Sequence, residues 1–137
     1  MNRGGSAFAG VLAPSLDDFA ILAQAAFASL PGEFRRLAGP VLFRIEDFAE
    51  AEVLEALEIE DAFELTGLYQ GVDLARRSVL DPAPETAMVF LYRRPILDEW
   101  AERGDVPLGE LITHVLVHEI GHHFGLSDAD IDAIEAD

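Results

Sequence analysis

The segment from His118 to Asp128 reads HEIGHHFGLSD, and it restricts the local fold more than any other part of the chain. Residues four apart on an α-helix project from one face, about 6 Å from each other, so the imidazoles of His118 and His122 can share one metal ion if this segment is helical. Gly125 permits a left-handed helix end, after which Asp128 can return as a third ligand. The segment therefore predicts a helix that ends in a metal site with one open position.

The pattern leaves structural alternatives open. HExxH arises by chance in about 1 of 100 chains of this composition, and its extension to Gly and Asp in about 1 of 10,000, so the extended motif carries most of the weight. His118 and His122 could still be hydrogen-bonded core histidines, and Ser127 or Asp128 could simply cap the last helix. Because so few residues follow Asp128, a ligand from a later helix is not expected, although Glu135 is present there.

Glu119 follows the first histidine and lies about 100° round the helix from it, between Leu108 and Ile112 in angle. Apolar surroundings raise the pKa of a carboxyl, and a general base near neutral pH requires such a raised pKa. Glu119 is therefore the predicted catalytic residue, which would take the proton of metal-activated water and pass it to the leaving amine. The alternative is an ordinary acid on the helix surface.

Other polar side chains have weaker assignments. His114 lies one turn before His118, where it could support the site or face a substrate, whereas His123 points away from it. Tyr69 and Tyr92 are the only tyrosines. Either could stabilise an oxyanion, but packing within strands is the favoured interpretation for both.

Composition limits the class of protein. With 137 residues, 50% of them hydrophobic, we expect one domain over residues 15–137 after a flexible lead-in at 1–14. The absence of cysteine leaves only nitrogen and oxygen ligands for a metal. A net charge of −17, with nine arginines and no lysine, argues against nucleic acid and anionic membranes as partners. We expect a cytoplasmic protein, and the oligomeric state stays open.

The apolar pattern and the turn residues predict an α+β chain. Strands are expected at 41–48, 65–72 and 87–92, with an irregular loop at 73–86. Helices are expected at 15–30, 33–38, 49–57, 96–103 and 108–124, and residues 130–137 form a short helix or fray. Helix 108–124 is apolar almost all round, which is typical of a core helix. Two imidazoles and a carboxylate on such a helix are costly unless they are paired or metal-bound.

Three segments together resemble a small bacterial family of minimal zincin-like metallopeptidases, formerly a domain of unknown function. They are GLYQGV at 67–72, LYRRPIL at 91–97 and HVLVHEIGHHFGLSD at 114–128. The resemblance implies a zincin-like α+β fold, with a small mixed β-sheet packed on the buried HExxH helix. It also implies zinc on His118, His122 and Asp128, Glu119 as the base, and an edge strand beside the cleft to which an extended peptide could add.

These observations predict a zinc-dependent metallopeptidase that acts on a peptide or protein substrate. Zinc is the expected ion, because it is the usual occupant of tetrahedral nitrogen and oxygen sites with one open position. Two histidines and a carboxylate also suit iron, so other divalent metals remain candidates. The alternative function is a catalytically silent zincin-like module that binds metal or peptide, while a metal-dependent nuclease is disfavoured by the charge.

Overall fold

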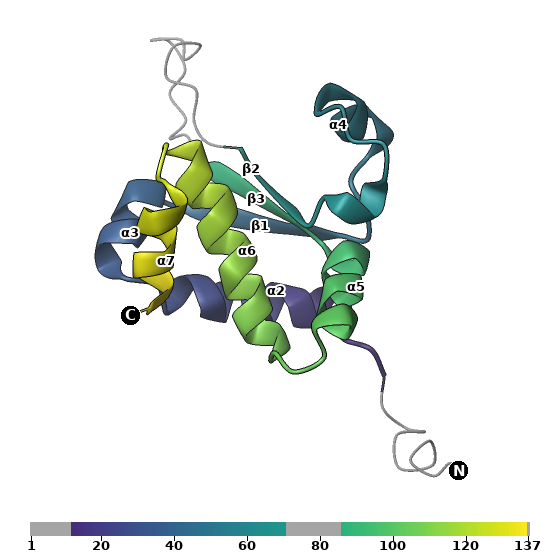
Figure 1. The fold of residues 1–137 in the computed structure, drawn as a ribbon, viewed down its shortest axis with the longest axis horizontal. Helices are drawn as coiled ribbons and strands as arrows, with labels where there is room; N and C mark the ends of the chain where they lie inside the picture. Colours follow the sequence, from purple (N-terminus) through teal and green to yellow (C-terminus); the bar gives the residue numbers. More distant parts are fainter. Residues whose placement is uncertain (1–11, 71–85, 137) are drawn as a thin grey trace.

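A three-stranded mixed β-sheet lies at the centre of the fold (Figure 1). The computed structural model describes residues 12–70 and 86–136. The strands are β1 (Val41–Glu46), β2 (Gly67–Gln70) and β3 (Ala87–Tyr92), in the spatial order β1-β3-β2. β1 runs parallel to the central strand β3, with Val41 opposite Ala87, and β2 runs antiparallel to it. The expected α+β class with a small mixed sheet is confirmed.

The two faces of the sheet belong to different apolar clusters, because successive strand residues point to opposite sides. Val89 and Leu91 on β3 are fully buried in the main core. Phe90 and Tyr92, on the other face, pack in a smaller cluster with Val53 of the helix α4 (Ala51–Ala56). The main core therefore lies on the face of the sheet that also carries the motif helix.

The motif helix α6 (Leu108–His123) crosses this face of the sheet, with α2 (Leu16–Ala28) beside it (Figure 1). It is a core helix, as its apolar pattern predicts, and eight of its residues are buried: Leu108, Leu111, Ile112, Val115, Leu116, Val117, Ile120 and Gly121. The last helix, α7 (Asp128–Ala136), lies alongside α6. The remaining helices are α3 (Gly32–Ala38), the 3-10 turn η1 (Ala62–Glu64) and α5 (Arg93–Arg103).

Several element boundaries differ from the sequence-based expectations. α5 begins at Arg93, directly after β3, whereas Pro95 suggested a start at Ile96. Proline is tolerated there because the first-turn N–H groups of a helix have no partner within the helix. β1, α4 and β2 are each shorter than expected, and α7 begins two residues earlier, after Ser127. Most of the loop expected at 73–86, the end of the second strand and most of the lead-in lie outside the described residues.

No helix within residues 12–70 and 86–136 is both long and apolar enough to span a membrane.

Candidate metal centre

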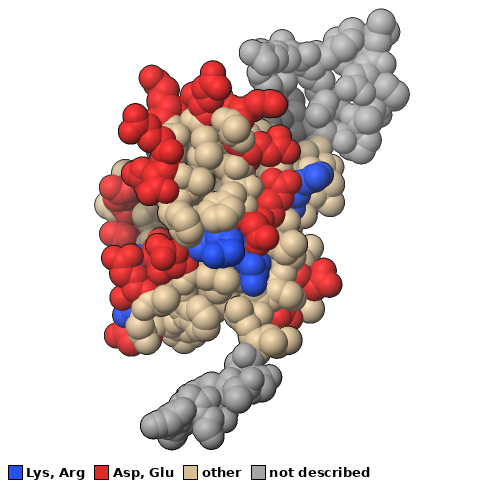
Figure 2. Space-filling model, turned by 90° about the vertical axis from the view of Figure 1, so that its right-hand side faces the viewer, with Lys and Arg blue, Asp and Glu red and all other residues tan. Residues whose placement is uncertain are grey.

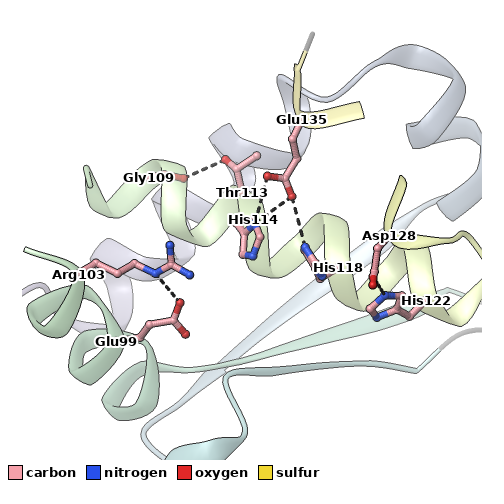
Figure 3. A network of polar contacts seen from close by, with 9 residues as sticks. All are labelled: Glu99, Arg103, Gly109, Thr113, His114, His118, His122, Asp128 and Glu135. Atoms are coloured by element: carbon pink, nitrogen blue, oxygen red, sulfur yellow. Dashed lines mark hydrogen bonds and ion pairs between the residues drawn. The ribbon is translucent and has the colours of Figure 1, made fainter. Parts of the chain in front are cut away.

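Three histidines lie at successive turns of α6 and form one row along the helix (Figure 3). The spacing of four residues between His114, His118 and His122 places them on one face. The ring centroids of His114 and His118 are 4.1 Å apart, and those of His118 and His122 are 5.4 Å apart. The three histidine side chains are partly or fully exposed, so this face of α6 is accessible to solvent although most of the helix is buried.

The chain reverses immediately after this row. Gly125 has a φ of +77°, in the left-handed region that favours glycine. The N–H of Gly125 donates to the carbonyl of His122 at 3.0 Å, and the N–H of Leu126 donates to that of Gly121 at 2.9 Å. These two bonds form the Schellman helix end that the position of Gly125 predicts. The turn sends α7 back along α6.

The capping of α7 distinguishes two roles that the sequence leaves open for Asp128. The N–H of Asp130 donates to the hydroxyl of Ser127, and the N–H of Ser127 donates to the carboxylate of Asp130, both at 3.1 Å. This reciprocal pair caps the helix without Asp128. The carboxylate Oδ1 of Asp128 lies instead 3.1 Å from Nε2 of His122 (Figure 3).

Gly121, for which the sequence predicts no role, permits the close approach of α6 and α7. A Cβ atom at this position would lie 3.0 Å from Cγ1 and 3.1 Å from Cδ1 of Ile131 on α7. Ile131 is fully buried against this surface. A glycine inside a helix costs about 1 kcal/mol relative to alanine, so an interior glycine is itself a signal of tight packing.

Glu119 lies on α6 next to the row of histidines, and its side chain is partly buried. Burial raises the pKa of this carboxyl above its usual range, and the nearby His122 acts in the opposite direction. The charge of Glu119 also contributes, after burial and the charges of Glu46 and Glu50, to the raised pKa of Tyr92. Burial therefore acts on the Glu119 carboxyl in the direction that the sequence predicts.

Comparison with known families identifies the chain. A sequence model of the zincin-like metallopeptidases matches residues 38–137. The chain belongs to this family. A comparison with curated proteins finds no match. Membership implies zinc binding, and the matched range contains β1 to β3, the motif helix and α7.

The ligands predicted for the zincin-like site suit a metal ion. One ligand atom from each of His118, His122 and Asp128 lies within 4.8 Å of the other two. Nε2 of His118 is buried and has no hydrogen-bond partner among the described residues. Buried polar atoms without a hydrogen-bond partner are rare in folded proteins. A bound metal ion would supply the missing partner of this nitrogen. Burial, followed by the proximity of His114, also lowers the pKa of His118, which favours the neutral, ligating form of the imidazole.

Glu135 of α7 lies beside this row, although no ligand was expected from so short a C-terminal segment. Its Oε1 atom is 2.9 Å from Nδ1 of His114 and 3.7 Å from Nε2 of His118. The reason is the direction of α7, which returns along α6 from Asp128, so that a residue two turns later lies beside His114 (Figure 3). Only the relative packing of the two helices reveals this position.

The two tyrosines have packing roles in the structure. The hydroxyl of Tyr69 donates to the carbonyl of Ala38 at 3.1 Å, and the ring of Tyr69 packs edge-on against His123, with centroids 4.7 Å apart. The side chain of His123 thus packs against β2 and is not part of the row of histidines. Tyr92 is buried in the smaller apolar cluster. These contacts agree with the favoured interpretation of both phenols as strand-packing groups.

Proposed function

We propose that this zincin-like chain is a zinc-dependent peptidase in which His118, His122 and Asp128 hold the ion and Glu119 is the general base. One observation carries the proposal: three nitrogen and oxygen ligands converge within 4.8 Å beside a buried, unpartnered Nε2 of His118. Three protein ligands and one open position are the arrangement of catalytic zinc sites, whereas structural sites are closed by four.

The positions of the side chains support these roles. When bound, zinc supplies Lewis acidity that polarises a carbonyl oxygen and lowers the pKa of water. Glu119 is offset from the row of ligands and partly desolvated, so its carboxylate is suited to accept the proton of an attacking water molecule. The protonated Glu119 then donates this proton to the departing amine, which completes cleavage of the peptide bond and returns the carboxylate to its starting state.

An extended peptide is the substrate that we propose, because β2 offers a free edge. Among the described strands β2 pairs with β3 alone, and it packs against α6. Main-chain groups at a sheet edge can hydrogen-bond an added strand. Acidic side chains cover much of the surface in Figure 2, around a small group of arginines, and the net charge is −17. Such a field favours the approach of basic rather than acidic peptides.

The substitution Glu119→Gln tests the proposal. It removes the base but none of the proposed ligands, so the zinc content should stay at the wild-type level while peptide hydrolysis falls by about 10²- to 10⁴-fold. Glu102→Gln, an exposed position on α5, is the control for loss of one negative charge. Activity in Glu119→Gln equal to that of the control would eliminate Glu119 as the base. Tight peptide binding without turnover by the zinc-loaded wild type would favour the catalytically silent module instead.

A further inference from the structure

The row of histidines on α6 contains two adjacent pairs, and each pair faces one acidic side chain of α7. His118 and His122 face Asp128, and His114 and His118 face Glu135 (Figure 3). Asp128 and Glu135 are seven residues apart, which corresponds to two turns and one face of the helix. The arrangement of two imidazoles and one carboxylate is thus present twice, displaced by one helical turn.

The second set meets the same geometric condition as the first. One ligand atom from each of His114, His118 and Glu135 lies within 4.8 Å of the other two. Both carboxylate oxygens of Glu135 approach Nδ1 of His114, at 2.9 and 3.0 Å, and Oε1 is 3.7 Å from Nε2 of His118. The last distance is longer than a hydrogen bond. The buried Nε2 atom of His118 therefore has the Glu135 carboxylate near it but no hydrogen bond to it. An ion between these atoms would satisfy all three groups.

The second set is also reachable from solvent. His114 and Glu135 line a cavity of about 610 Å³ between α6, α7 and the end of α2. Its wall includes Thr113 and Val117 of α6 and Ile134 of α7. A metal site needs an entry path as well as ligands, and this cavity provides one at the side of the row away from Asp128.

We propose that His114, His118 and Glu135 form a second metal-binding site, which shares His118 with the peptidase site. Two imidazoles and a carboxylate suit Zn²⁺ and other divalent transition metals. Because both sets need the imidazole of His118, the chain binds a single ion at a time, in either of two positions along α6. An ion in the second position removes a ligand from the first and lies one helical turn further from Asp128, so this state is catalytically silent.

Metal binding without any peptide substrate tests the second site. The double variant His122→Ala/Asp128→Asn retains only the second set, and His118→Ala removes a ligand from both. We expect wild type to bind one Zn²⁺ or Co²⁺ per chain, and the double variant to bind one ion at least about tenfold more tightly than His118→Ala. Adding Glu135→Gln to the double variant should remove this difference, and the Co²⁺ absorption spectrum of the double variant should differ from that of wild type.

His123→Ala is the matched control, because His123 lies on the same helix but packs against Tyr69 rather than in the row. It should leave every measured affinity unchanged. Two outcomes overturn the second site as proposed. In one, His122→Ala/Asp128→Asn binds metal no more tightly than His118→Ala, and in the other, wild type binds two ions at saturation. Since the readout is metal binding, its failure is distinguishable from absence of peptidase activity.

Discussion

Oδ1 of Asp128 lies 3.1 Å from Nε2 of His122, although the two residues are on different helices joined by a turn of four residues. The contact depends on the left-handed conformation of Gly125 and on the cap that Ser127 and Asp130 form. Local backbone geometry thus directs a carboxylate to the end of the histidine row, where it is placed to act as the third ligand that we propose for zinc.

In a Glu135→Gln background, which lacks the second set of ligands, we therefore expect Asp128→Asn to weaken zinc binding by at least about tenfold, because even residues that only support a ligand cost 10- to 100-fold when removed. Asp130→Asn is the matched control, since it removes the same charge from the same turn and asparagine still caps helices. Competition with a chromophoric chelator measures both affinities. Equal zinc affinity in the two variants would exclude Asp128 as a ligand.

The sequence was sufficient for the parts of the site that depend on local geometry. The spacing of His118 and His122 predicts a shared helix face, and Gly125 predicts the helix end, because both depend on residues a few positions apart. The sequence does not predict the place of Glu135 beside His114, since it depends on how α7 packs on α6. The strand order β1-β3-β2 likewise depends on pairing between distant segments. Pro95 suggests a boundary in the sequence, and only the observed start of α5 at Arg93 shows that this proline lies in a first turn, where it is tolerated.

Gly121 offers a test of the packing that brings Asp128 and Glu135 to the histidines. Gly121→Val should lower the free energy of unfolding by about 1–3 kcal/mol, because its side chain would overlap Ile131 and separate α7 from α6. It should also weaken zinc binding. Gly109→Val is the control on the same helix, where the nearest atom to an added Cβ is 4.0 Å away, on Leu22. Urea unfolding should give a change within about 0.5 kcal/mol for the control. Similar losses at both positions would contradict the proposed close approach.

Tyr92 predicts a loss of stability in alkaline solution. Its side chain is 1% exposed, and burial, with the charges of Glu46, Glu50 and Glu119, raises its pKa to about 12. The pKa of an unfolded tyrosine is about 10, so above this pH the unfolded chain releases a proton that the folded chain retains. The free energy of unfolding should be unaffected by Tyr92 below pH 10, and should fall by up to about 2–3 kcal/mol as the pH approaches 12. Urea unfolding of wild type and Tyr92→Phe across this range isolates the effect, because Tyr69 titrates in both proteins. The wild-type curve should fall more steeply than that of the variant, and parallel curves would mean that the Tyr92 phenol is not shielded in the folded state.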